Sequence, residues 1–425
     1  MTVQALRAFE RAHGVQFAEV VQVPLEGEGV VERRVERLYK SLTENEAHMS
    51  AVRNADVVFV VAHSQGSVVA AHLVDRLFAD GVLVSGVHAS GHGHGEEEQG
   101  DGVVHSALGV VDPGASAIGV PPPPRKGRTA QRVCLLAMCG IHLGPLRYLS
   151  SSTLVGPYLQ YFESMAAREL FEFQNTESAV SKAYVGALTR VLDHGTKVVY
   201  IASLNDQVVP IYSGLFTAAN HPLILRALYI DGDAYHSSDF LCALLILLLR
   251  IRNAGLPDSG LLAHLSEATA GSLSGIGHST AYEEEACYRL AVDYLFLADD
   301  GRSVQEVLTR ASSPSDPEHD PDLPPYTYTH PPLTVDPFNA AQEQNDYEIP
   351  WALRDVIADE RIAWLFREEF ERLKRAFGEW APRTGVLREV KRKLQPITRL
   401  GSGSGGVGVG VGGGVGMGRG GGSKL

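Results

Sequence analysis

The chain has few cysteines and no paired spacing among them. Its 425 residues include four, at positions 134, 139, 242 and 287, mostly within apolar runs and without a C-x-x-C pair. That arrangement offers neither a zinc–thiolate site nor a redox pair. We therefore expect four buried thiols in a reducing compartment, and neither a metal centre nor a cofactor.

An excess of positive charge, a secretory signal and a membrane-length apolar run are also lacking. Lys and Arg total 37 against 50 Asp and Glu, and the net charge of -13 gives no electrostatic footprint for a nucleic acid. The N-terminus, MTVQALRAFERAHG, lacks the charged and then apolar order of a secretory signal. The most apolar run, FLCALLILLL at 240–249, is far shorter than the about 20 residues of a membrane-spanning helix. We expect a cytoplasmic protein without a transmembrane segment, in which this run is a buried core helix.

What the sequence does contain is an alternation of helical and strand patterns. This order is typical of a mostly parallel sheet wrapped by helices. Strands are predicted at 15–23, 57–61, 133–138, 197–202 and 225–230, and helices at 5–13, 35–42 and 67–78. Gly14 is the predicted C-cap of the first helix. The run VVFVV at 57–61 is unbroken and β-branched, as in a strand covered on both faces.

Composition divides the chain into a main domain and three additions. The parts are a main α/β domain at 1–305, a Pro-rich linker at 306–346, a helical segment at 347–397 and a Gly-rich disordered tail at 398–425. Within the main domain, 86–131 is rich in Gly, His, Pro and acidic residues and is expected to be a disordered loop. The aromatic-rich stretch 146–194 is expected to be a helical cap.

The helical segment near the C-terminus carries one apolar face. Its members are Leu353, Ile357, Ile362, Leu365, Phe366, Phe370, Leu373 and Phe377. Such a face must be covered, so this helix should pack onto the main domain or onto a partner.

A candidate nucleophile stands between a predicted strand and a predicted helix. The segment VVFVVAHSQGSVVAAHLV places Ala62, His63, Ser64, Gln65 and Gly66 at the turn. This is the context of a G-x-S-x-G nucleophile elbow, in which the serine occupies a strained turn flanked by small residues. We predict Ser64 as the nucleophile and the Gln65 amide, at the positive end of the helix, as the first oxyanion donor. The alternative is an ordinary connection with a capping serine.

An acid and a base should follow in the chain order Ser, Asp, His. Asp206 comes directly after the strand at 197–202, and His236 follows the strand at 225–230. Both stand at carboxyl ends of strands, where ligands meet such sheets. We predict a triad of Ser64, Asp206 and His236. The alternatives are a turn aspartate and a packing histidine.

Other histidines rank lower. His278, in GIGHSTAYEEE, is the second choice for the base. His142 follows the strand at 133–138 and could line the site, although a histidine satisfied within its own loop is the more ordinary interpretation. His92 and His94 alternate with glycines in the insertion, where a metal site is not expected.

These motifs together resemble an uncharacterised fungal family of α/β-hydrolase-fold proteins that is distantly lipase- and esterase-like. The resemblance rests on AHSQG, NDQVVP, DGDAYHSSDF and VCLLAMCGIHLGPLRYL, and covers roughly 1–300 and 347–397. It implies the α/β-hydrolase fold and the triad positions Ser64, Asp206 and His236, but no settled substrate. The insertion and the Gly-rich tail depart from the family pattern.

The front of this fold is expected to be incomplete. Only the predicted strand at 15–23 precedes 57–61, so the strand that normally lies between these two is not found. The loop that carries the second oxyanion donor normally follows that strand, so it is expected upstream of Met1. We expect 15–23 either to stand about 9 to 10 Å from 57–61 or to pair with it directly.

The expected function is cleavage of a carboxylic ester, with acyl or lipid esters favoured, through an acyl-enzyme on a serine. A non-catalytic interaction protein with this fold is the alternative from a different class. It would be favoured by a missing oxyanion loop and by an exposed apolar face on the C-terminal helix.

The last three residues, Ser423, Lys424 and Leu425, form the S-K-L signal read by a peroxisomal import receptor. A Gly-rich tail would keep that end accessible. A peroxisomal matrix location would favour fatty acyl esters or, as a further alternative, acyl-CoA thioesters. A chance ending of a low-complexity segment is the competing interpretation.

Overall fold

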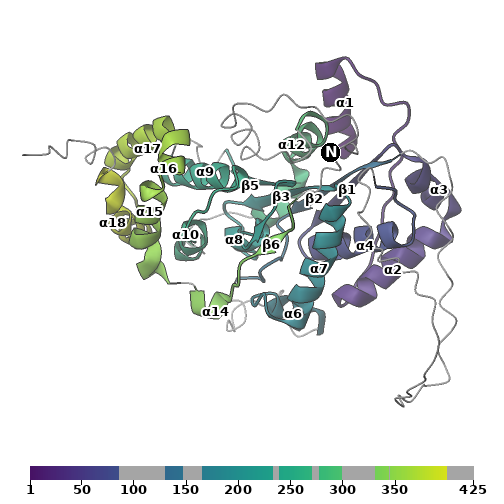
Figure 1. Cartoon of the computed structure of the whole chain (residues 1–425), viewed down its shortest axis with the longest axis horizontal. Coiled ribbons are helices and arrows are strands. Elements are labelled where there is room, and N and C mark those ends of the chain that lie inside the picture. Colours follow the sequence, from purple (N-terminus) through teal and green to yellow (C-terminus); the bar gives the residue numbers. More distant parts are fainter. Residues whose placement is uncertain are drawn as a thin grey trace, which may run out of the picture.

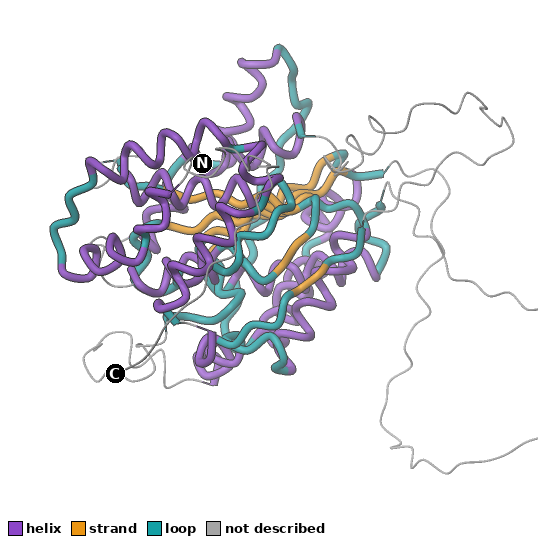
Figure 2. The backbone as a smooth tube through the Cα atoms, turned by 60° about the vertical axis from the view of Figure 1, so that its left-hand side comes forward, coloured by secondary structure: helices purple, strands orange, loops and turns teal. Residues whose placement is uncertain are grey.

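The sheet of this protein is parallel and lies between two layers of helices (Figures 1 and 2). The computed structural model describes residues 1–85, 130–146, 165–232, 239–269, 277–298, 331–343 and 345–399. The strands of the four-stranded sheet, in spatial order, are β1 (Val57–His63), β2 (Arg132–Met138), β3 (Lys197–Ser203) and β5 (Ile224–Tyr229). A separate antiparallel pair joins β4 (Ala219–Asn220) to β6 (Thr334–Val335). Four of the five predicted strands are therefore confirmed in place.

Different helices cover the two faces of the sheet. One face packs against α1 (Thr2–His13) and α12 (Glu285–Leu297), and the other against α2 (Val31–Glu44), α4 (Gly66–Ala79) and α7 (Ala179–Asp193). The remaining helical elements of these layers are α3 (Glu46–Asn54), α6 (Met165–Glu172), α8 (Ile211–Gly214), α11 (Gly277–Thr280) and η2 (Ala281–Glu283). The predicted C-cap of the first helix is confirmed, because Gly14 has φ 65° and its N–H bonds the carbonyl of Glu10.

The predicted strand at 15–23 is wrong. This segment is irregular and passes around the edge of the sheet from α1 on one face to α2 on the other. Phe17 packs with the apolar cluster under α1, whereas Val23 and Leu25 pack with the cluster on the opposite face. The alternating apolar residues of this segment therefore pack against opposite faces of the four-stranded sheet, and they do not indicate that the segment is itself a strand.

Strand β1 lies at the edge of the sheet, with β2 as its paired neighbour in the described part of the chain. Most of its residues are half-buried and Val61 is 37% exposed, whereas every residue of β3 is buried. The expectation that residues 57–61 form a strand covered on both faces is therefore met only in part.

The predicted cap does not extend to α7. Tyr184, Leu188 and Leu192 on that helix are fully buried against the sheet, so α7 belongs to a core layer of the domain. Residues 147–164 of the predicted cap, like most of the predicted disordered loop, lie outside the described residues.

The predicted linker is partly built into the domain. Its described part places β6 beside β4, and Phe338 is buried next to Thr176, whose side chain and backbone contact the Phe338 carbonyl. A proline-rich composition does not prevent such packing where an apolar side chain fits a neighbouring layer.

The C-terminal segment forms several short helices instead of one. They are α14 (Ala340–Glu343), η3 (Asp346–Glu348), α15 (Ile349–Ala358), α16 (Glu360–Leu365), α17 (Arg367–Glu379), α18 (Gly385–Lys393) and η4 (Gln395–Arg399). Asp359 separates α15 from α16 by accepting hydrogen bonds from two backbone N–H groups at the start of α16. The apolar face packs on α9 (Phe240–Asn253) and α10 (Leu261–Thr269) of the same chain, where Phe240 contacts Phe377. The face therefore has an intramolecular partner.

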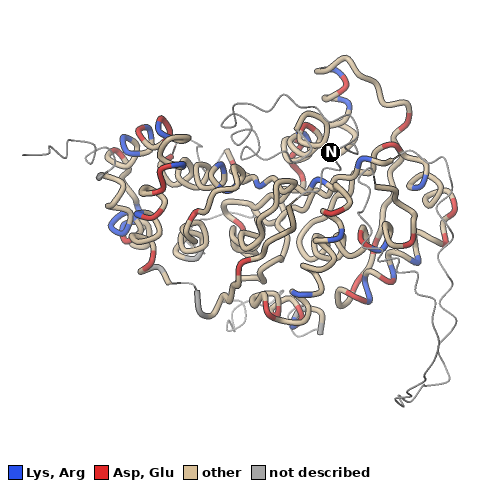
Figure 3. Tube along the Cα trace, viewed as in Figure 1, with Lys and Arg blue, Asp and Glu red and all other residues tan. Residues whose placement is uncertain are grey.

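The 240–249 run is the buried helix α9, as predicted. Among the described residues, none of the helices combines the length and apolarity needed to cross a membrane. In Figure 3 the acidic and basic residues are interspersed along the outer helices.

Candidate active site

Ser64 occupies the sharp turn between β1 and α4. Its φ is 56°, a conformation that non-glycine residues rarely adopt, and its N–H bonds the Met138 carbonyl on the neighbouring strand at 2.9 Å. This strain raises the hydroxyl above the end of the sheet, as a nucleophile elbow does. A Cβ added at Gly66 would meet no atom within 4 Å, so the neighbours do not impose a small residue there, contrary to our expectation.

Asp206 follows β3, two strands away from Ser64. Two strand spacings amount to about 10 Å. A serine and an aspartate on such strands cannot touch, but one imidazole ring can reach both. Cys139, at the end of the intervening strand β2, lies beneath this gap with φ 48° and its N–H on the Ile201 carbonyl.

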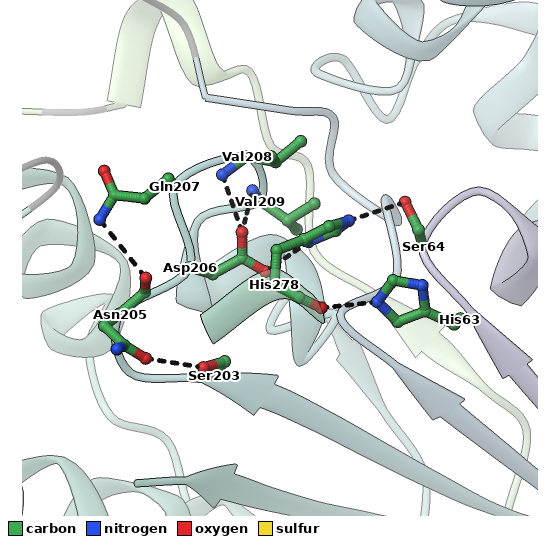
Figure 4. Close-up of polar contacts among 9 residues, drawn as sticks. All are labelled: His63, Ser64, Ser203, Asn205, Asp206, Gln207, Val208, Val209 and His278. Atoms are coloured by element: carbon green, nitrogen blue, oxygen red, sulfur yellow. Dashed lines mark hydrogen bonds and ion pairs between the residues drawn. The ribbon is translucent and has the colours of Figure 1, made fainter. Parts of the chain in front are cut away.

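The bridging ring is that of His278. Its Nδ1 lies 2.8 Å from Asp206 Oδ2, and its Nε2 lies 3.2 Å from Ser64 Oγ (Figure 4). Because the carboxylate accepts the Nδ1 proton, the neutral ring offers an unprotonated Nε2 to the serine hydroxyl. Ser64 and His278 are partly accessible, whereas the Asp206 side chain is 2% exposed. This is the relative order of accessibility that a nucleophile, a base and an orienting acid require.

The structure therefore corrects the predicted position of His236, because the ring between Ser64 and Asp206 is that of His278, our second choice. His236 itself belongs to residues 233–238, which lie outside the described part of the chain. His278 reaches the site from α11, after the chain has left the sheet through α9 and α10 and returned.

Two backbone N–H groups hold the Asp206 carboxylate in place. Val208 and Val209 each donate to Oδ1 at 2.8 Å, which leaves Oδ2 for His278. Burial, with the nearby Asp206 charge, holds the pKa of the Cys139 thiol well above its usual range. Cys139 is therefore a neutral thiol beside the acid.

Gly277 lets α11 approach the sheet. A Cβ at this position would lie 2.1 Å from Asn205 Oδ1 and 2.3 Å from Ser203 Oγ, far inside contact distance. The Ser203 hydroxyl and the Asn205 side chain are hydrogen-bonded to each other at 3.1 Å, so a shift of either would disturb this bond. A glycine directly before His278 is the sequence signal for this close approach. The signal can be interpreted only when the position of Asn205 opposite Gly277 is known.

Gln65, the expected oxyanion residue, is buried at the N-terminus of α4. Its side-chain oxygen accepts from Arg34 Nη1 at 2.7 Å, and its Nε2 donates to the Gly29 carbonyl at 3.3 Å. These contacts fix the residue whose backbone amide follows Ser64. They also place the glycine-containing turn before α2 next to the elbow.

Three potential ligands of a soft metal ion lie near one another beside Ser64. Within the described residues, ligand atoms of His63, Cys139 and His278 lie within 4.8 Å of one another. Each has another role, however: His278 bridges the acid and the serine, His63 bonds a carbonyl, and the raised thiol pKa disfavours the thiolate that a metal needs. The cluster is therefore explained by these other contacts. His92 and His94 lie outside the described residues.

His142 is a core histidine. It is 1% exposed, its Nδ1 lies 3.0 Å from the Ser213 carbonyl, and its ring lies among Tyr184, Tyr200 and Phe216. Burial lowers its pKa from 6.5 to about 4. The ordinary interpretation of this residue is thus the one that the geometry supports.

Comparison with known proteins agrees with this architecture. The family model for the YMC0/YMC35 alpha/beta hydrolase domain matches residues 1–89 and 127–330. The chain belongs to this α/β-hydrolase family. The matched ranges of the hydrolase domain include Ser64, Asp206 and His278, and they confirm the predicted fold. Searches of curated proteins and of solved structures gave no match.

Proposed function

We propose that this α/β-hydrolase-fold protein is a serine hydrolase that cleaves a carboxylic ester through an acyl-enzyme. The observation that carries the proposal is the His278 ring, which joins Ser64 Oγ to Asp206 Oδ2 at 3.2 and 2.8 Å. Outside an active site, a buried aspartate and a strained, accessible serine have no structural need for a shared imidazole.

Each triad residue has a role in the reaction. His278 Nε2 takes the hydroxyl proton while Ser64 Oγ attacks the ester carbonyl, and Asp206 stabilises the imidazolium through Nδ1. The Gln65 amide and the N-terminus of α4 stabilise the tetrahedral oxyanion. The imidazolium then protonates the leaving alcohol, and the neutral ring activates water to release the acid and restore Ser64.

An acyl or lipid ester is the substrate class that we favour. Val208, whose N–H holds the Asp206 carboxylate, is partly exposed and packs against the buried side chains of Ile141, Leu170 and Val209. An apolar side chain beside the acid favours an acyl chain over a polar substituent. The alternative of a non-catalytic interaction protein loses one of its supports, because the C-terminal apolar face is covered by α9 and α10.

Covalent labelling tests the proposal. The full chain should react with a fluorophosphonate probe, and Ser64→Ala should abolish labelling, because the probe traps only an activated serine. The matched control is Ser67→Ala, three residues further along the same turn and helix. No labelling of the folded wild-type chain, or labelling that persists in Ser64→Ala, would contradict the proposal. A series of p-nitrophenyl esters of increasing acyl length then tests the substrate class.

A further inference from the structure

The helix that carries His278 cannot define its own position. Helix α11 has four residues, Gly277–Thr280, and continues into the three-residue turn η2. One helical turn closes very few internal hydrogen bonds. The position of α11 over the sheet must therefore come from contacts with other elements.

His63 makes one of these contacts, with the main chain of His278. Its Nε2 lies 2.7 Å from the carbonyl oxygen of His278 (Figure 4). A carbonyl oxygen only accepts, so the His63 ring donates its Nε2 proton to it. The bond is short and mostly shielded from water, because His63 is half-buried under α11.

The His63 ring also contacts the aromatic groups on either side of this bond. Its centroid lies 4.7 Å from that of the His278 ring and 4.8 Å from that of Tyr282, which it meets edge to face. Tyr282 belongs to η2, and its carbonyl accepts from Tyr288 Oη on α12 at 2.6 Å. The His63 side chain thus contacts both α11, which carries His278, and the following turn η2.

The strand that carries His63 is a firm attachment point. His63 is the last residue of β1, in register with Met138 of β2, and Ser64 follows it directly. The end of β1 therefore carries Ser64 and also, through His63, binds the backbone of His278, whose ring contacts the Ser64 hydroxyl.

We propose that His63 is a positioning residue that holds the main chain of His278, and so its ring, at the correct height over Ser64; this inference rests on the function proposed above. The two hydrogen bonds of the triad are made by the His278 ring, and the hydrogen bond of His63 goes to the main chain. If the N–H of His63 is removed, α11 keeps its contact through Gly277 but loses the hydrogen bond from His63 to the His278 carbonyl. A shift of about 1 Å there is expected to cost about 10²-fold in rate.

Two substitutions separate the hydrogen bond from the packing. His63→Phe keeps an aromatic ring against Tyr282 and removes the donor, whereas His63→Gln carries an amide N–H at a reach close to that of Nε2. His72→Phe, on α4 and away from the triad, is the matched control. For each full-length variant we would measure the fluorophosphonate inactivation rate, kcat and KM for p-nitrophenyl butyrate, the unfolding temperature and the low-field proton resonance of the His278–Asp206 bond.

The expected result is a drop of about 10- to 100-fold in inactivation rate and kcat for His63→Phe, with KM little changed. His63→Gln should recover most of this loss, His72→Phe should match the wild type, and the low-field resonance should broaden in His63→Phe alone.

Wild-type rates in a folded His63→Phe, or equal losses in both His63 variants, would overturn the inference. If His63→Phe does not fold, His63→Leu takes its place in the comparison with His63→Gln. A wild-type chain that neither labels nor turns over refutes the proposed function, and the resonance then still decides whether His63 positions His278.

Discussion

His278 and Asp206 are 72 residues apart in sequence, yet Nδ1 of the first lies 2.8 Å from Oδ2 of the second. The carboxylate is ready for this partner because its other oxygen is already held by two backbone N–H groups. A fixed acid orients the imidazole and selects the tautomer that can accept the Ser64 proton.

The first prediction separates the two candidate bases. His278→Asn should lower the fluorophosphonate inactivation rate by about 10⁴-fold or more, since it removes the group that takes the serine proton. His236→Asn should leave the rate within about threefold of the wild type, because His278 already makes both hydrogen bonds. Stopped-flow or gel-based labelling of both variants measures this. A large loss in His236→Asn with a small loss in His278→Asn would reverse the assignment.

The second prediction concerns the close approach at Gly277. In Gly277→Ala the new methyl group would collide with Asn205 and Ser203, so α11 must move and carry His278 with it. The rate of ester hydrolysis should fall by about 10²-fold. Gly378→Ala is the control, because a Cβ on that exposed glycine of α17 meets nothing within 4 Å. It should stabilise the chain by about 0.5 to 1 kcal/mol without changing activity. Full activity in Gly277→Ala would show that α11 has room to adjust.

The third prediction is that none of the four cysteines reacts in the folded protein. All are at most 5% exposed, and burial raises the pKa of Cys134 and Cys287 to about 12 and that of Cys242 to about 11. The reactive species is the thiolate, which is scarce at neutral pH for such groups. A thiol-specific chromogenic disulfide should therefore detect four thiols only in denaturant. Ser41→Cys, at an exposed position on α2, should react at once in the native state. Rapid modification of the wild type would contradict the burial of these thiols.

The fourth prediction concerns stability in mild acid. Burial lowers the pKa of His142 to about 4, against 6.5 for an ordinary histidine. Between these values the unfolded chain binds the proton and the folded chain does not, so the free energy of unfolding falls as the pH drops from 6.5 towards 4. The contribution lost is on the order of 3 kcal/mol. His142→Asn, which can keep the bond to the Ser213 carbonyl without titrating, should show a flatter loss of stability in denaturant melts at pH 7 and pH 5. The exposed His13→Asn is the control, and an unchanged slope in His142→Asn would argue against a neutral buried ring.

The fifth prediction concerns the address formed by Ser423, Lys424 and Leu425, which lie outside the described residues. A fluorescent protein that ends in residues 400–425 should collect in peroxisomes, because the import receptor reads this tripeptide at an accessible C-terminus. Deletion of Leu425 alone should return it to the cytosol. A diffuse signal from the intact tail would rule out the address.

The sequence by itself determined the parallel sheet, the sharp turn at Ser64 and the place of Asp206 at the end of a strand. Each follows from local order: a β-branched run, a turn and an apolar helix predict the elbow, and an aspartate just after a strand stands at the sheet's carboxyl edge. Periodicity also marked the apolar face of residues 353–377, although not its division into several helices.

Only the tertiary structure decided which histidine lies between Ser64 and Asp206. His236 was favoured because it directly follows a strand, and that argument uses sequence neighbours alone. His278 follows two helices, and its place depends on the return of the chain to the sheet, the fit of Gly277 against Asn205 and the His63 bond to its carbonyl. The prediction of a strand at 15–23 was wrong for the same reason. Alternating apolar residues predict burial on alternate sides of the segment, but they do not say whether the segment pairs as a strand or only packs against other elements.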